Sequence, residues 1–333
     1  MTAETTSTST VAADRPPVKR SPAGWRIVAR KELADHLLSA RFAVLLLVIG
    51  LTGLAAVYAA ASAIRDVAPD ASGTPALFLK LFTVSADPIP FSLVQFVAFL
   101  GPLLGIAFGF DAINGERAER TLPRLVSQPI YRDEVVNGKF VAGLSVISAI
   151  LATVLLLVAG FGILRLGIVP TGGEVARMVV WLLAAVLYVG VWLAVAILCS
   201  VLMRRGATAA LFAIAVWLVF ALFFSFLAGI AADVIAPEGT TFDEALSHAE
   251  TELSLQRLSP ATLFDESTAA LLDPEVRTLG IVTFEQLDQA VVSELSLTQS
   301  LLLVWPQLIG LVALTTVLFA ASYIAFMRQE VRA

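Results

Sequence analysis

Long stretches without a single charged residue alternate along this chain with short charged segments. The uncharged stretches cover residues 42–64, 88–110, 140–164, 178–203, 206–232 and 295–327. A helix needs about 20 apolar residues to cross the hydrocarbon core of a bilayer, and every one of these stretches is long enough. Helices buried inside soluble proteins are seldom apolar on all sides over such a length. We therefore expect an all-α polytopic membrane protein whose transmembrane domain, residues 42–327, has six transmembrane helices, at about 42–64, 89–110, 140–164, 178–203, 207–231 and 301–327.

Composition points to the same class. The chain is 58% hydrophobic and only 15% charged, with a mean hydropathy of +0.86, whereas about a quarter of the residues in a soluble protein are charged. The single cysteine, Cys199, lies within the fourth uncharged stretch. One cysteine allows neither an intramolecular disulfide nor a zinc site built from several thiolates.

The distribution of basic residues predicts the orientation. If both termini lie on one side of the membrane, that side holds sixteen of the 22 Lys and Arg residues. They are Arg15, Lys19, Arg20, Arg26, Arg30, Lys31, Arg41, Arg117, Arg120, Arg124, Arg132, Lys139, Arg204, Arg205, Arg328 and Arg332. Short cytoplasmic loops of membrane proteins carry an excess of Lys and Arg. We expect a multi-pass protein of the plasma membrane with both termini in the cytoplasm.

The segments that flank the spans are of three kinds. Residues 1–22 are rich in Thr, Ser, Ala and Pro and predict a disordered cytoplasmic tail. Residues 23–41 contain good helix formers after Gly24, with apolar residues on one broad face. This pattern fits an interfacial helix along the inner leaflet with its cations near lipid phosphates, and it fits a plain extension of the first span equally well. Residues 328–333 form a short cytoplasmic C-terminus.

The largest segment outside the spans is the extracellular loop at 232–299. It contains thirteen acidic residues and only two basic ones, a balance that usually serves solubility. Thr241–Glu244 has the pattern of a capping box that opens a helix. Pro260 and Pro274 divide the loop into about three helical pieces, and we expect the part from 276 to 295 to fold back on the mouth of the bundle.

Motifs for catalysis and metal binding are missing from the sequence. It has no phosphate-binding loop, no paired-histidine zinc motif and no nucleophile elbow. We therefore assign no catalytic residue, no metal ligand and no cofactor to this chain, and do not expect an enzyme. The predicted spans also lack Asp, Glu, Lys, Arg and His, which ion-driven transporters usually retain in the membrane. If the chain moves a solute uphill, we expect the energy to come from another subunit.

An ordered polar insert, Asp111 to Lys139, separates the second and third spans. Asn114-Gly115 favours a turn, Glu116 to Leu122 then predicts a short surface helix, and Pro129 ends it. The exposed leucines of this helix would fit a groove in a partner protein. A solvated turn at the membrane surface explains the same residues equally well.

Two features of the spans concern packing and the substrate path. Gly101, Gly105 and Gly109 form a stripe of small residues on the second span, which lets another helix approach closely. Packing within one subunit is the plainer explanation of the stripe, and a dimer seam is the alternative.

The substrate path is not fixed by the sequence. Its candidates are Phe220, Phe223 and Phe224 in the aromatic-rich fifth span, although side chains that simply face lipid would look the same.

Several short motifs follow one another along the chain in a definite order relative to the spans. In the insert they are Asp111, Gly115-Glu116-Arg117, Thr121-Leu122, Leu125, Ser127-Gln128-Pro129, Arg132, Val135 and Gly138-Lys139. Elsewhere they are Ala29–Leu33 with Asp35, Leu258–Pro260, Leu271–Pro274, Ser322-Tyr323 and Phe326–Arg332. From about residue 24 to the end, this order resembles the permease subunit of type-2 ABC exporters, in the branch of the permease for nitrous oxide reductase maturation.

The resemblance implies a permease subunit that pairs with a second copy of itself and with a separate ABC ATP-binding subunit. ATP and Mg would bind to that partner and not to this chain. Residues 112–138 would form a cytoplasmic coupling segment. Its contacts with the ATP-binding subunit would be Glu116, Arg117, Glu119, Arg120, Thr121, Leu122 and Arg124. Pro123 departs from the family pattern, which leaves the length of the coupling helix open.

On this basis we expect a subunit that exports an unidentified substrate with ATP hydrolysed elsewhere. Two alternatives stay open: service to copper-enzyme maturation of the nitrous oxide reductase type, and an ATP-independent membrane scaffold or receptor. Membrane lipids are further expected partners, and nucleic acid is not.

Overall fold

The computed structural model of the chain describes residues 24–67, 76–118, 132–281 and 294–329. Within these ranges the regular structure is helical, apart from one isolated bridge between Ala86 and Ile89. The first helices are α1 (Gly24–Leu37), α2 (Ala40–Val67), α3 (Leu77–Thr83), α4 (Leu93–Gly109), α5 (Asn114–Ala118), α7 (Arg132–Leu166) and α8 (Gly172–Leu202). The others are α9 (Gly206–Leu218), the π-helical turn η2 (Val219–Phe223), α10 (Phe224–Ile235), α11 (Phe242–Gln256), α12 (Pro260–Leu272) and α14 (Leu297–Arg328).

Six helical stretches in the described part of the chain are long and apolar enough to cross a membrane. They are Ala40–Asp66, Leu93–Ala118, Asp133–Leu166, Gly172–Leu202, Gly206–Ile235 and Leu297–Arg328. The expected all-helical class with six such helices is confirmed. Most of these helices run beyond the uncharged stretches. Charged residues are excluded from the hydrocarbon core of the membrane, but they can still continue the helix on either side of it. For example, α7 begins seven residues before Lys139 and has Asp133 and Glu134 in its first turn, where acidic residues interact favourably with the helix dipole.

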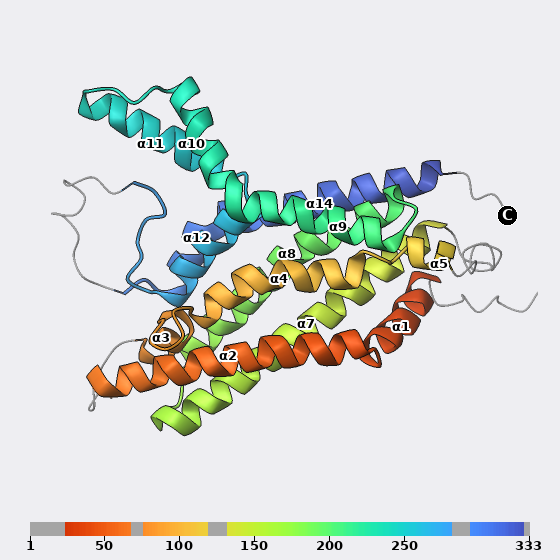
Figure 1. Cartoon of the computed structure of the whole chain (residues 1–333). Helices are drawn as coiled ribbons and strands as arrows, with labels where there is room; N and C mark the ends of the chain where they lie inside the picture. Colours follow the sequence, from red (N-terminus) through yellow and green to blue (C-terminus); the bar gives the residue numbers. More distant parts are fainter. Residues whose placement is uncertain (1–23, 68–75, 119–131, 282–293, 330–333) are drawn as a thin grey trace, which may run out of the picture.

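The long helices run roughly along one direction and give the bundle two ends (Figure 1). We call the end that holds α1, α5 and the C-terminus of α14 the terminal end. The opposite end, which holds α3 and the C-terminus of α12, is the distal end. The most central helix is α8, which packs against α4, α7, α9, α12 and α14. On the other side of α7, α2 packs against both α7 and α4, and α1 lies along α7.

The glycine stripe of α4 lies against α8 of the same chain. A Cβ atom added at Gly105 would lie 2.6 Å from the backbone oxygen of Val189, and one at Gly109 would lie 2.7 Å from Cβ of Ala196. At Gly101 the corresponding distance to the Val189 side chain is 2.9 Å. Side chains at these positions would force the two helices apart. The stripe is therefore covered by α8 within the subunit, and is not a free seam in this arrangement.

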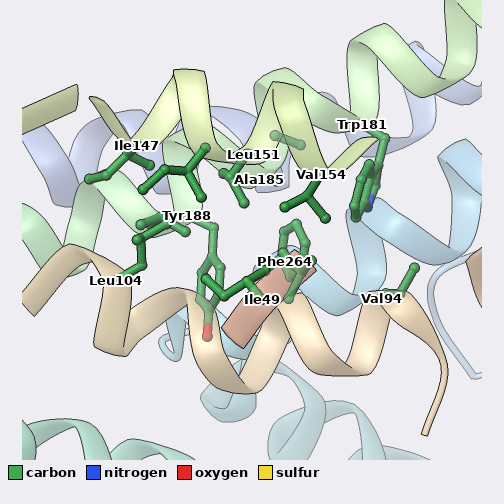
Figure 2. Close-up of a cluster of buried hydrophobic side chains, with 14 of the residues drawn as sticks. Ile49, Val94, Leu104, Ile147, Leu151, Val154, Trp181, Ala185, Tyr188 and Phe264 are labelled. Carbon is green, nitrogen blue, oxygen red and sulfur yellow. The ribbon is translucent and has the colours of Figure 1, made fainter. Parts of the chain in front are cut away.

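The helix α12 lies in the distal half of the bundle, with its C-terminus at the distal end (Figure 1). Figure 2 shows Phe264 of α12 next to Trp181 and Tyr188 of α8, within the buried cluster that also contains Leu104 and Leu151. Ser259 caps the helix and Pro260 occupies its first turn, so the sequence favours a helix start at this point. From the sequence we expected residues 276–295 to fold back on the bundle. Part of that segment does lie half-buried against the core, but 282–293 fall outside the described residues.

A buried arginine holds the distal end of α12. The Arg177 side chain of α8 is 5% exposed and donates hydrogen bonds to the backbone oxygen of Leu271 at 3.0 Å and to Ser300 Oγ at 3.1 Å. It also donates to the backbone oxygen of Leu295. A guanidinium with several donors can bind the free carbonyls at a helix C-terminus and one hydroxyl at the same time. Arg177 thus joins α8, α12 and the start of α14.

The fifth membrane-crossing stretch bends where α9 passes into η2. Beyond η2, α10 turns away from the bundle and forms a hairpin with α11 (Figure 1). The hairpin is closed by His248 Nδ1, which lies 2.8 Å from the backbone oxygen of Ala236. A π-helical turn breaks the regular hydrogen-bond pattern and is a common cause of such a bend.

Candidate functional site

The turn after α4 is bound to the neighbouring helices at the terminal end. The backbone N–H groups of Ile113 and Asn114 both donate to Ser200 Oγ, at 2.9 and 3.2 Å. Asp111 accepts a hydrogen bond of 2.6 Å from Arg41 Nη2 at the start of α2. These bonds fix the position at which α5 begins relative to α2 and α8.

A buried lysine joins three helices next to this turn. The Lys139 side chain of α7 is only 5% exposed, and its Nζ lies 2.9 Å from Glu32 Oε1 of α1 and 3.2 Å from Glu116 Oε1 of α5. We call these three residues the Lys139 cluster. A buried ammonium is stable only when anionic groups compensate its lost hydration. The cluster therefore makes the placement of α5 depend on both α1 and α7.

Close packing brings α1 to this position. A Cβ atom added at Gly138 would lie 2.7 Å from Cβ of Val28, so only glycine lets α1 lie directly on α7 here. At the beginning of α1, the backbone N–H of Gly24 donates to Glu134 Oε1 at 2.8 Å. Further along α1, burial lowers the pKa of His36, whose ring contacts Phe108 edge-on at 5.2 Å between centroids.

The guanidinium of Arg117 connects α5 to the ends of α8 and α14. It donates to the backbone oxygen of Val201 at 3.3 Å and to the side-chain oxygen of Gln329. Gln329 in turn donates to the same Val201 oxygen at 2.8 Å. Beneath these bonds lies a small buried cluster formed by Ile113, Val136, Val201 and Phe326.

The structure describes only some of the residues that are predicted to contact the ATP-binding subunit. Glu116 and Arg117 lie in α5 and are bound within the chain, and the Glu116 side chain is 13% exposed. Pro123 and the other predicted contacts lie outside the described residues. These contacts are Glu119, Arg120, Thr121, Leu122 and Arg124. The length of the predicted surface helix therefore stays a prediction.

Sequence reasoning missed the partners of these residues. Ser200 carries no local pattern, and the motifs that contain Glu32 and Gln329 gave no indication of which residues these two would contact. Lys139 did carry a signal, because it directly precedes an uncharged stretch of 25 residues, 140–164, and a lysine in such a place needs either a lipid phosphate or a buried anion.

The buried side chain of Asn114 has unusual surroundings. It is 1% exposed, and neither Nδ2 nor Oδ1 has a hydrogen-bond partner. A buried amide without partners costs about 1–3 kcal/mol, so such groups are rare in packed structures.

The three aromatic candidates of the fifth stretch lie at the bend. Phe220 and Phe224 stack with their ring centroids 4.8 Å apart, and Phe220 meets the Trp192 ring edge-on at 6.1 Å. Phe223 is 55% exposed. In the described residues no group of three or more His, Cys, Asp or Glu is close enough to hold a metal ion.

Comparison with known proteins identifies the family to which this helical bundle belongs. The model of a family described as ABC-2 family transporter protein matches residues 26–331, which is nearly the whole chain. The chain belongs to this ABC-2 transporter family.

Two curated relatives agree with that assignment. The chain is 31% identical over 212 residues to the probable ABC transporter permease protein NosY of Stutzerimonas stutzeri, covering 60% of this chain and 67% of the relative. It is also 31% identical over 209 residues to the protein of the same name from Pseudomonas aeruginosa, covering 61% and 68%. Its family and six apolar helices make this ABC-2 protein a multi-pass membrane protein and an ABC transporter permease subunit, and its two relatives are named as transport components.

Proposed function

We propose that this ABC-2 permease is the membrane subunit of an ATP-driven exporter. A separate ABC ATP-binding subunit would bind ATP and Mg, and a second copy of the permease would complete the membrane domain. The terminal end of the bundle would face the cytoplasm, as its basic residues indicate. Residues 112–138 would contact the ATP-binding subunit there.

The observation that carries this proposal is the attachment of the segment that follows α4. Between residues 113 and 117, this segment is tied to α8 through Ser200, to α7 and α1 through Lys139, and to the end of α14 through Arg117. A displacement of the segment by a partner would therefore act on all these helices together. Such a connected element is what a change between two bundle arrangements, biased by nucleotide, requires.

The buried Asn114 amide is consistent with a second arrangement. Its two unpaired polar atoms make the described arrangement less stable than one in which they find partners. A shift of α5 relative to Ser200 and Gly206 would change the surroundings of this amide, because Gly206 lies beside Asn114 Oδ1.

Co-expression tests the proposal. The full chain is expressed with the ABC ATP-binding subunit encoded next to it, and pull-down and ATP turnover are measured. We expect a stable complex, and we expect Arg120→Glu and Arg124→Glu to reduce both readouts. Glu250→Lys, on the exposed surface of α11, is the control and should leave both unchanged. A complex that is unaffected by both arginine changes would overturn the assigned contact.

The same experiment separates the scaffold alternative. A scaffold or receptor would not need ATP turnover. A folded chain that pulls down no ATP-binding subunit would therefore favour this alternative. Service to copper-enzyme maturation is a narrower version of the main proposal. It rests on the resemblance of the short motifs to the permease for nitrous oxide reductase maturation, and is tested by measuring the copper-enzyme activity of cells that lack this chain.

A further inference from the structure

The helix α1 meets α2 at a break and does not continue into it. α1 ends at Leu37, α2 begins at Ala40, and Ser39 Oγ accepts a hydrogen bond of 3.2 Å from the Phe42 backbone N–H. A serine in this position caps the start of a new helix. Figure 1 shows α1 set at an angle to α2 at the terminal end. α1 is therefore a separate helix, and its outer face points in a direction of its own.

The middle of α1 lies at the edge of the membrane-crossing region. Lys139, which directly precedes the uncharged stretch 140–164, lies 2.9 Å from Glu32 in the middle of α1. At the same end, Arg41 and Asp111 pair at 2.6 Å where the uncharged stretches of α2 and α4 end. Because charged side chains are costly in hydrocarbon, these residues mark the level of the lipid headgroups. The part of α1 on either side of Glu32 therefore lies near that level.

Two exposed arginines share one side of α1. Arg26 and Arg30 are four residues apart, so their side chains project about 40° apart and one turn from each other. Neither has a hydrogen bond or an ion pair with any residue that the structure describes, although Arg26 lies over the Trp25 ring, 5.4 Å from its centroid. The exposed acid of α1, Asp35, is rotated by about 140° or more from both arginines and pairs with Lys31 at 3.4 Å. Within the described part of the chain, the two arginines thus lack a compensating acid.

The same side of α1 also presents apolar side chains. Ile27 is 50% exposed, and Leu38, about three turns further on, is 89% exposed. Together with Lys31 and Ala34, Ile27 and the two arginines line an open groove of about 520 Å³. A helix with cations beside exposed leucine and isoleucine fits the headgroup region of a bilayer, where the apolar side chains reach the acyl chains and the cations reach the phosphates.

We propose that Arg26 and Arg30 form a binding site for the phosphate of an anionic membrane lipid, in the leaflet at the terminal end. Two guanidinium groups one turn apart can donate several hydrogen bonds to one phosphodiester, and their planar shape suits this group. Two cations without a matching acid favour a lipid with net negative charge over a zwitterionic one. Ile27 and Leu38 would contact the acyl chains of the same lipid, which a soluble phosphate lacks.

Lipid binding to the full-length permease tests this site. The protein is purified in a neutral detergent and titrated with dioleoylphosphatidylglycerol or dioleoylphosphatidylcholine, and the bound lipid is measured by native mass spectrometry. The two lipids share their acyl chains and differ in headgroup charge. We expect the anionic lipid to bind with a Kd at least about fivefold lower, because one basic side chain near an anionic lipid surface changes binding by about this factor.

The double variant Arg26→Gln with Arg30→Gln should lose this preference for the anionic lipid. Both side chains are exposed, so the variant should keep the melting temperature of the wild-type protein. A double variant that keeps both its fold and its preference would overturn the site. Displacement of the bound anionic lipid by an equal concentration of glycerol 3-phosphate would also overturn it, because the site would then be one for a soluble phosphate.

Arg204→Gln with Arg205→Gln is the matched control, since it removes two exposed arginines from the turn between α8 and α9 at the same end. The control should keep the preference for the anionic lipid. Equal loss in both double variants would show a diffuse charge effect and overturn the site.

The ATP-binding subunit is the other candidate for this face of α1. If Arg26→Gln with Arg30→Gln abolishes the pull-down of that subunit and leaves the lipid preference intact, the face belongs to the subunit and the lipid site is overturned. The lipid titration uses the permease alone, so its failure is distinct from failure of the pull-down that tests the proposed function.

Discussion

Lys139 of α7 and Glu116 of α5 lie 23 residues apart in the chain, and their side chains meet at 3.2 Å in a nearly solvent-free position. The same ammonium lies 2.9 Å from Glu32 of α1. One buried cation thus contacts two acids from two other helices, and Lys31 also lies 3.4 Å from Glu32 Oε1. If the lysine is lost, two acids remain close together in a nearly buried position without its charge, so the placement of α1 and α5 depends on α7.

Replacement of the lysine tests this dependence. Lys139→Met keeps most of the side-chain volume but removes the buried ammonium that lies between Glu32 and Glu116. Breaking a buried ion pair from one side costs about 3–5 kcal/mol. We expect a large drop in thermal stability and loss of ATP turnover in the complex with the ATP-binding subunit.

The control for this change is Lys31→Met. Lys31 also lies near Glu32, at 3.4 Å, but its side chain is 58% exposed. An exposed pair contributes about 0–1 kcal/mol, so its loss should be small. The triple variant Lys139→Met with Glu32→Gln and Glu116→Gln removes all three charges and should recover part of the stability. If it is no more stable than Lys139→Met, charge compensation is not the cause.

Close packing between α4 and α8 is tested at Gly105. The Gly105→Ala side chain would meet backbone atoms, the Val189 oxygen at 2.6 Å and the Leu193 nitrogen at 2.8 Å, which do not rotate away. Overpacking of this kind costs about 1–3 kcal/mol. We expect a lower melting temperature in detergent.

Gly50→Ala is the companion variant, because a Cβ at Gly50 has no atom within 4 Å. Alanine favours the helix by about 1 kcal/mol over glycine, so this change should be neutral or stabilising. Equal destabilisation by both variants would mean that helix flexibility, and not the contact with α8, explains the effect at Gly105.

The attachment of α12 is tested at Arg177. Arg177→Met removes the donors to Leu271 and Ser300 while keeping an apolar side chain in place. The freed carbonyls at the end of α12 then lack partners, so we expect faster amide hydrogen exchange in α12 and little change in α2. Arg65→Met is the control, because Arg65 is exposed and makes one long contact of 3.5 Å. Unchanged exchange in α12 after Arg177→Met would show that apolar packing alone holds this helix.

The sequence was sufficient for the parts of the fold that depend on local chemistry. Runs without charge identified the six membrane-crossing helices, since exclusion of charge from hydrocarbon acts residue by residue. The capping pattern at Thr241 located the start of α11, where Thr241 Oγ1 accepts from the Glu244 backbone N–H. The stripe at Gly105 indicated a close helix contact, but not which helix makes it, because spacing on one helix carries no information about its partner.

The parts that escaped prediction depend on contacts between distant segments. Nothing near Pro260 in the sequence shows that α12 enters the bundle, because its apolar face is short and its partners are distant in the chain, among them Trp181 and Tyr188, more than 70 residues earlier. Similarly, Glu32 and Lys139 are 107 residues apart. Their pairing follows from the fit of Val28 over Gly138, which is a property of the packed helices and not of either segment.

The acidic residue of α12 predicts a specific dependence of stability on pH. The pKa of Asp265 is about 6 in the folded protein and about 4 in an unfolded chain. Between these values the folded state binds more protons than the unfolded state, so this group's contribution to stability falls as the pH rises from 4 to 6. Above pH 6 the penalty is constant, and below pH 4 it disappears. Asp265→Asn cannot ionise and should lack this dependence.

We therefore expect Asp265→Asn to be more stable than the wild-type protein at pH 7.5, and the difference to shrink towards zero near pH 4. Because the carboxyl is accessible to solvent on one side, the gain at pH 7.5 should be on the order of 1 kcal/mol. Melting temperatures in detergent between pH 4.5 and 7.5 measure it, and subtraction of the wild-type curve removes the titration of the other acids. Asp243→Asn, the exposed control on α11, should show no such trend. A variant that is less stable than the wild type at pH 7.5 would mean that Asp265 has a cationic partner in the assembled protein, since only a compensated carboxylate stabilises the fold when ionised.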